Sequence, residues 1–130
     1  MTIEDLAKKE TVISQPDVRA VEFNDCYSRT QVRDAIDTQH LDPAGQVELD
    51  WFMDKKNWDT PEAQKLSEGK ICFFFFFGAA NGNFVPYIYV HGQQFKQDSS
   101  RIDWQNDKRN WYADSRALIR NEISSSNSKQ

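Results

Sequence analysis

The sequence predicts a single α+β domain. We expect an antiparallel sheet built on a central aromatic hairpin at about residues 70–91, packed against several short helices and a C-terminal amphipathic helix. The chain has 130 residues, the usual size for one domain, so we expect a domain over 1–123 and a disordered tail over 124–130. The continuous apolar run Ile71–Phe77 is typical of a strand buried on both faces. Proline and glycine signals bracket short helices on its N-terminal side.

The aromatic hairpin is the best-defined element of the sequence. Asn81-Gly82 supplies the residues of positive φ that tight hairpin turns require, and strand character resumes at Phe84. We therefore expect a strand at 70–78 to pair with a strand at 83–91. Pro86 lies inside the second strand, and because proline has no N–H to donate, we expect an edge or a bulge there.

Helix-start signals predict three short helices on the N-terminal side of the hairpin. In each case a capping side chain is followed by a partner three positions later or by proline in the first helical position. The predicted helices run from Thr2 to about Glu10, over 29–39 after Ser28, and over 61–68 after Thr60, with Gly69 as the C-terminal signal.

The segment 43–55 fits two periodicities. Asp42-Pro43 is a helix-start signal, whereas polar and apolar residues alternate from Val47 to Met53 as they would in a strand. Phe52 breaks this alternation, and we favour a helix.

Three weaker patterns complete the element order. Residues 18–23 fit a strand of imperfect alternation, and 101–104 fit another after a polar turn at 96–100. After Asn106 or Asp107, apolar residues from Trp111 to Ile123 recur at helical spacing, which predicts the C-terminal amphipathic helix.

Composition disfavours several classes of function. A net charge of −4 and a pI near 5.1 argue against the broad basic field that non-specific nucleic-acid binding needs. Cys26 and Cys72 lack the spacing of a zinc or redox motif, so we expect free thiols. The first residues are acidic where a signal peptide is basic, and no apolar run reaches the length of a membrane span. We therefore expect a cytoplasmic protein that does not contact membranes.

Motifs of catalysis are missing from the sequence. The histidines are His40 and His91, and HExxH, GxSxG, P-loop and GxGxxG patterns do not occur. We therefore disfavour an enzyme and expect neither a cofactor nor a metal.

The acidic segment 42–59 carries the leading functional hypothesis. On a helix Asp50 and Asp54 lie one turn apart, and such an acidic pair is best matched by a basic partner surface. Tryptophan next to such residues is enriched at interface hot spots. We therefore favour a small acidic protein-interaction protein of the inhibitor, immunity or adaptor type, with self-association as a further option. The expected partner-binding residues are Asp50, Trp51, Asp54, Trp58 and Asp59.

The competing hypothesis is a small-molecule pocket, with or without catalysis, in a cone fold with a curved sheet. Tyr87, Tyr89 and His91 alternate onto one strand face, and Tyr27 or Trp104 would close the pocket. A weaker third hypothesis is nucleic-acid binding through cationic and aromatic residues of the C-terminal helix, namely Arg109, Trp111, Arg116 and Arg120.

The two faces of the Phe73–Phe77 strand provide the discriminating observation. If one face is open to solvent, an interface with another chain is almost forced, because an apolar patch of that size promotes aggregation. If both faces are covered, the binding surface lies elsewhere.

Overall fold

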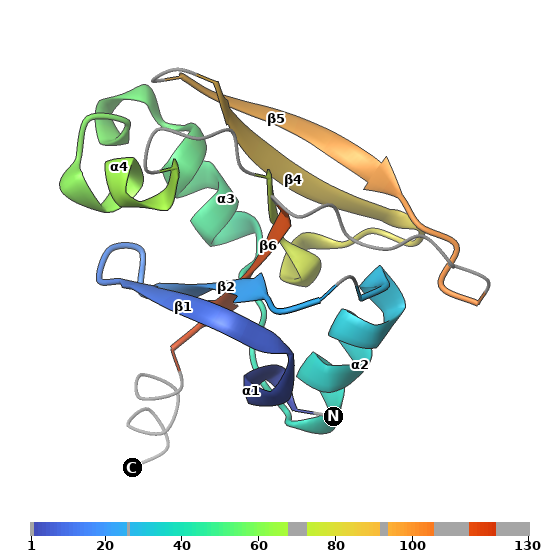
Figure 1. Cartoon of the computed structure of the whole chain (residues 1–130). Coiled ribbons are helices and arrows are strands. Elements are labelled where there is room, and N and C mark those ends of the chain that lie inside the picture. The colour runs from blue at the N-terminus through green and yellow to red at the C-terminus, as the bar shows by residue number, and fades with distance from the viewer. Residues whose placement is uncertain (1, 26, 68–72, 92–93, 106–114, 122–130) are drawn as a thin grey trace, which may run out of the picture.

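A mixed sheet with helices on both faces makes up the fold, an α+β architecture (Figure 1). The computed structural model describes residues 2–25, 27–67, 73–91, 94–105 and 115–121. The sheet has the order β1-β2-β6-β3-β4-β5. The strands are β1 (Ala7–Ile13), β2 (Val18–Phe23), β3 (Phe73–Phe75), β4 (Phe84–His91), β5 (Gln94–Arg101) and β6 (Ser115–Arg120).

The sequence predicts an antiparallel sheet, but the observed sheet is mixed. Neighbouring described strands pair antiparallel except β3 and β6, which run parallel with Phe74 opposite Arg116. This parallel pair joins the N-terminal β1-β2 hairpin and β6 to the aromatic strands at the centre of the sheet.

Helices cover both faces of the sheet. α1 (Ile3–Leu6) and α2 (Arg29–Thr38) lie on one side, and α3 (Gln46–Met53) and α4 (Pro61–Ser67) lie on the other (Figure 1). Two 3₁₀ turns, η1 (Lys55–Asn57) and η2 (Phe77–Ala79), follow α3 and β3. The predicted capping boxes at Thr2 and Ser28 are both present and begin α1 and α2. The helical interpretation of 43–55 is confirmed, because α3 occupies its centre.

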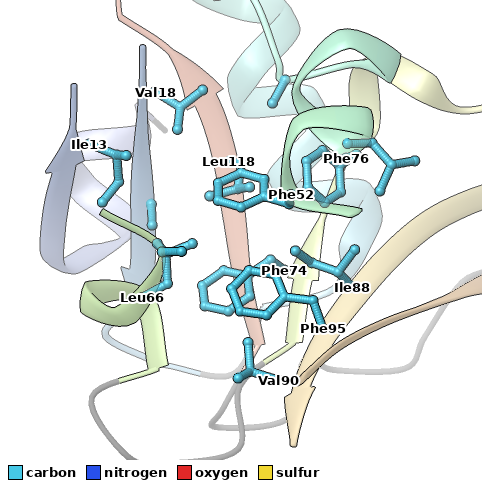
Figure 2. Packing of buried hydrophobic residues seen from close by; sticks show 14 residues of the cluster. Ile13, Val18, Phe52, Leu66, Phe74, Phe76, Ile88, Val90, Phe95 and Leu118 are labelled. Atoms are coloured by element: carbon cyan, nitrogen blue, oxygen red, sulfur yellow. The ribbon is translucent and has the colours of Figure 1, made fainter. Parts of the chain in front are cut away.

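Two hydrophobic clusters lie on the two faces of the sheet. We call them the α3-side cluster, which includes Phe52 and Leu118, and the α2-side cluster, which includes Val32 and Ile119. Figure 2 shows the α3-side cluster, where Phe52 lies among rings and aliphatic chains from several strands. Because consecutive residues of a strand point to opposite faces, the phenylalanine run contributes to both clusters.

The phenylalanine run is therefore covered on both faces by the chain itself. Phe74 and Phe76 belong to the α3-side cluster, whereas Phe75 and Phe77 belong to the α2-side cluster. Phe73 is half-buried against the α2-side cluster. Burying each ring contributes roughly 1.5–3 kcal/mol. Phe74, Phe75, Phe76 and Phe77 act as core, so a binding surface has to be sought among less buried residues.

β3 pairs antiparallel with β4, with Phe74 opposite Ile88. β3 ends at Phe75, earlier than predicted, because η2 begins at Phe77. A tight turn is present one residue later than predicted: Asn81 and Phe84 exchange two backbone hydrogen bonds, so Gly82 and Asn83 are its central residues. Gly82 has a φ of 60°, whereas Asn81 does not have the positive φ that the sequence suggested. Residues 70–72 of the predicted strand lie outside the described residues.

The expected edge or bulge at Pro86 was wrong. β4 lies between β3 and β5, and its register with β5 runs without a shift through Pro86 and Ser99. The Pro86 carbonyl accepts a hydrogen bond from the Phe76 N–H at 3.0 Å. Proline is tolerated here because β3 has already ended, so the missing N–H leaves no gap inside that ladder.

The C-terminal helix was wrong over 115–120, where the chain forms strand β6. β6 lies between β2 and β3, and Leu118 points to one cluster while Ala117 and Ile119 point to the other. A central strand buried on both faces is continuously apolar, so a short segment of it resembles a helical stripe. Residues 106–114 and 122–123 of the predicted helix lie outside the described residues.

Two other boundaries differ from the predictions. Residues 7–10 are strand and not helix, because α1 ends at Leu6 and Ala7 has extended backbone that enters β1. The predicted polar turn at 96–100 lies within β5. Arg101 is the last residue of β5, so the strand expected at 101–104 is not present beyond that residue. β5 is polar since most of its side chains are exposed.

Candidate functional site

The outward side of α3 is one candidate binding surface. The inward side of this helix buries Leu49 and Phe52 in the α3-side cluster. On the outward side Val47 is 72% exposed, and Asp50 is also exposed. Trp51 lies one turn from Val47 and is half-buried, so part of its ring faces solvent. We call Val47, Asp50, Trp51 and Asp54 the α3 outer surface.

The two tryptophans of segment 42–59 have different environments. Trp58 donates its indole N–H to the Phe52 carbonyl at 2.8 Å and stacks on Phe95 at a centroid distance of 5.9 Å. Trp51 packs edge-on against Phe52 at 5.0 Å. Trp58 therefore fastens the turn after α3 to the core through its indole N–H, and both tryptophans are half-buried against the α3-side cluster.

The aspartates of this segment also differ. Asp50 accepts a hydrogen bond from the Gln46 side chain at 2.8 Å on the helix surface. Asp54 accepts a hydrogen bond from the Lys56 N–H at 3.2 Å, and its carboxylate lies 3.5 Å from the Lys56 ammonium. Asp59 is exposed. Because Lys56 offsets the charge of Asp54, Asp50 and Asp59 contribute most of the local negative charge.

An ion-pair cluster fixes the start of α3. Arg120 binds Glu48 through two hydrogen bonds of 2.9 Å, from Nε and Nη2, and reaches Asp42 through Nη1 at 3.1 Å. Burial alone would raise the pKa of Glu48, but hydrogen bonds from Arg120 and from the Gly45 N–H outweigh burial and hold it below 4.5. Hydrogen bonds to Glu48, and further ones to Asp42, raise the pKa of Arg120 despite burial.

The basic residues of the nucleic-acid hypothesis that the structure describes, Arg116 and Arg120, are both engaged in ion pairs. Arg120 is held by Glu48 and Asp42, and Arg116 forms an ion pair with Glu22. Arg109 and Trp111 lie outside the described residues.

A second candidate surface lies on the other face of the sheet, at Phe73, Tyr87 and Tyr89, which we call the aromatic patch. All three side chains are half-buried. The Phe73 ring centroid lies 5.9 Å from that of Tyr87 and 5.9 Å from that of Tyr89. Across the β4-β5 ladder, Lys96 is opposite Tyr89 and Asp98 is opposite Tyr87, and both charged side chains are exposed.

Tyr87 joins the aromatic patch to the core. Its ring stacks on Phe75 at 5.0 Å, and Arg29 of α2 lies over the Phe75 ring at 5.6 Å. Burial raises the pKa of the Tyr87 hydroxyl, and the neighbouring Asp98 and Tyr89 raise it further. The phenol therefore stays protonated at neutral pH and can donate a hydrogen bond.

Trp104 and Tyr27 lie on the border of the same α2-side cluster. Trp104 donates its indole N–H to the Gly82 carbonyl at 3.0 Å, and Arg33 lies over its ring at 4.2 Å. The Tyr27 hydroxyl donates to the Asn24 side chain at 2.6 Å. The structure thus places Tyr27, Tyr87 and Trp104 against one cluster, with Tyr89 beside Phe73. His91 ends β4, and its side chain lies outside what the structure describes.

Several residues of these surfaces were missed from the sequence. Val47 was named only as the start of an alternating pattern and not as a binding residue, although its spacing from Trp51 places the two on one side of a helix. Phe73 was assigned to the core with the rest of its run. Lys96 and Asp98 were assigned to a turn, because residues 96–100 are polar on both faces of β5 and leave no alternation in the sequence.

The described residues contain neither a cluster of metal ligands nor a membrane-spanning helix. Within these ranges His, Cys, Asp and Glu side chains do not gather in groups of three or more that would suit a metal ion. A helix of sufficient length and apolarity to span a membrane is also not found there.

The chain matches no protein-family model, no curated protein and no solved structure.

Proposed function

We propose that this protein is a protein-interaction protein that binds a partner through the α3 outer surface. The observation that carries this proposal is the exposure of Val47, which is 72% exposed one turn from the half-buried Trp51. An exposed aliphatic side chain next to a partly open tryptophan gives the apolar centre that interfaces use.

The covered phenylalanine run supports this choice of surface. Phe74 is 1% exposed and Phe75 is 4% exposed, so the faces of the central strand are occupied by the chain's own helices. Among the described residues, the large apolar side chains that are exposed, Val12, Val47 and Phe84, lie on different elements, and Val47 on α3 lies next to carboxylates.

A basic partner surface is the best match. Asp50 is exposed beside Val47 and Trp51, and Asp59 is exposed after η1. Such charges at the border of an interface raise the association rate and select against acidic partners. Asp54 contributes less, because Lys56 already neutralises it.

Val47→Arg tests the proposal directly. A partner is first captured from extracts with the full chain and purified, and its affinity for each variant is then measured by isothermal titration calorimetry. Val47→Arg removes the apolar contact and places a positive charge toward a basic surface, so we expect binding to weaken by about ten-fold or more. Asp50→Lys should weaken binding in the same direction.

Val12→Arg is the matched control, because Val12 is also exposed, at 60%, but lies on β1 far along the sheet order from the aromatic strands. Its affinity should equal that of the wild type. If Val47→Arg binds the partner as tightly as Val12→Arg does, the α3 outer surface is not the interface.

A further inference from the structure

We propose that the aromatic patch is a second binding site, independent of the α3 outer surface, and that it takes a nucleobase by stacking. Phe73 on β3 and Tyr87 and Tyr89 on β4 provide the rings, and Lys96 and Asp98 on β5 provide polar groups at their border. This is the α2 side of the sheet, opposite the face on which α3 packs.

The patch is a rigid platform. β4 is paired with β3 and β5, and α2 lies on the same face of the sheet and places Arg29 over Phe75. The three ring centroids form a triangle with sides of 5.9, 5.9 and 6.3 Å, so each ring adjoins the other two. Aromatic side chains on adjacent strands are the usual platform for unstacked bases, because every base has a flat π-face.

The polar neighbours suit the edge of a base. The Asp98 carboxylate accepts hydrogen bonds, and the Lys96 ammonium donates them. Lys96 and Asp98 flank Gln97 on β5, so they are two residues apart and point to the same face of the sheet. Both are exposed on the face that carries the tyrosines. Asp98 already accepts the Ser99 N–H at 2.8 Å, and its carboxylate has further acceptor positions. A nucleobase carries donors and acceptors along one edge, so it complements this pair, whereas a purely apolar ring makes no hydrogen bond to either group.

The charge of the chain limits how much nucleic acid the site can hold. A net charge of −4 opposes a long phosphate backbone, and Asp98 itself stands at the border of the patch. The ligand is therefore one or two bases, either as a free nucleoside or nucleotide or as unpaired bases of a single strand.

Chemical-shift titration of the full chain tests the site. The probes are adenosine, adenosine 5′-monophosphate, ribose 5-phosphate and a short single-stranded oligonucleotide. We expect the first two to shift the amide resonances of Phe73, Tyr87 and Tyr89, and ribose 5-phosphate to leave them unchanged. Tighter binding of the oligonucleotide assigns the source to a single strand, and equal binding assigns it to the free nucleoside. Failure of every base-bearing probe, or equal shifts with ribose 5-phosphate, overturns the proposal.

Three variants separate stacking from other causes. Tyr89→Leu removes one ring of the platform and should weaken adenosine binding by at least about five-fold, whereas Tyr89→Phe keeps the ring and should retain it. Phe84→Leu is the control on the same strand, because Phe84 is 52% exposed but occupies the opposite register. Equal loss in Tyr89→Leu and Phe84→Leu overturns the proposal.

Val47→Arg distinguishes this proposal from the proposed function. Because Val47 lies on α3, on the other face of the sheet, this change should leave adenosine binding unaltered. Partner binding and adenosine binding are therefore measured separately, so either proposal can fail without the other.

Discussion

Arg120 joins strand β6 to the start of α3. Its Nε and Nη2 atoms donate to Glu48, its Nη1 atom donates to Asp42, and its backbone N–H donates to the Asp42 carbonyl at 2.8 Å. The Glu48 carboxylate also accepts the Gly45 N–H at 2.8 Å, which caps α3. One arginine therefore fixes the helix that carries the proposed partner surface.

Glu48→Gln should destabilise the fold by about 1–2 kcal/mol at neutral pH, because it removes charged hydrogen bonds to Arg120. The effect stays in this range because the Arg120 side chain is about one-third exposed to solvent, which weakens the interaction. The folded-state pKa of Glu48 is lowered, so its contribution is present above the unfolded carboxyl value of 4.5 and is lost as pH falls through the lower folded value. Urea unfolding of wild type and variant at several pH values should show their difference narrowing below pH 4.5.

Asp50→Asn is the control for this measurement, since Asp50 is an exposed carboxylate of the same helix. We expect its stability to stay within about 0.5 kcal/mol of the wild type. A difference for Glu48→Gln that persists unchanged into acid would contradict the role given to the ionised carboxylate.

At the level of elements, the segment before α3 is held between β6 and η2. The Ala44 N–H donates to the Leu118 carbonyl at 3.0 Å, and the Gly78 N–H donates to the Ala44 carbonyl at 2.9 Å. Gly78 has no space for a side chain, because a Cβ atom there would lie 2.5 Å from the Pro43 carbonyl oxygen. The glycine allows this close approach of two backbones.

Gly78→Ala should therefore force the two segments apart and destabilise the protein by about 1–3 kcal/mol. Gly45→Ala is the matched comparison, because its Cβ would come no closer than 3.3 Å to the Gly78 carbonyl oxygen. Thermal unfolding of both variants measures the difference. Equal melting temperatures for the two variants would show that the contact at Gly78 relaxes without cost.

Helices were predicted better than strands because their signals are local. Ser28 and Gln31 cap α2 through side chains three residues apart. The helix expected in 43–55 is present, but Asp42-Pro43 placed its start too early, because Gly45 is the N-cap of α3 and Pro43 forms a β-bridge with Ile119. β6 was missed because its burial on both faces leaves no period of two, and its partners Phe73–Phe75 lie about 40 residues earlier in the chain. Parallel pairing of that kind leaves no trace in a local window.

The candidate surfaces were predictable only in part. The alternation of Tyr87 and Tyr89 placed both rings on one face, and the structure agrees. The sequence could not show that Trp58 would be bonded to the Phe52 carbonyl while Trp51 stays half-buried, because that depends on the turn at η1. Exposure of Val47 likewise depends on which side of α3 meets the sheet.

The whole molecule is organised around a strand that serves two cores. The phenylalanine run sends alternate rings to the α3-side and α2-side clusters. Helices α3 and α4 cover the first cluster, and α1 and α2 cover the second. This arrangement leaves the proposed partner surface on one face and the aromatic patch on the other. Phe74, Phe75, Phe76 and Phe77 are core, and we propose that binding belongs to the half-buried rings beside them, among them Phe73 at the start of the run.

Hydroxyl-radical footprinting with peptide mass analysis tests this claim most directly, because aromatic rings react according to their solvent access. Phe74, Phe75 and Phe76 are at most 4% exposed, whereas Trp51 and Tyr89 are half-buried. The native protein should show modification of Trp51 and Tyr89 and little modification of the three phenylalanines, which should become reactive in urea. Modification of Phe74 or Phe75 in the native protein at the rate of Tyr89 would contradict the account.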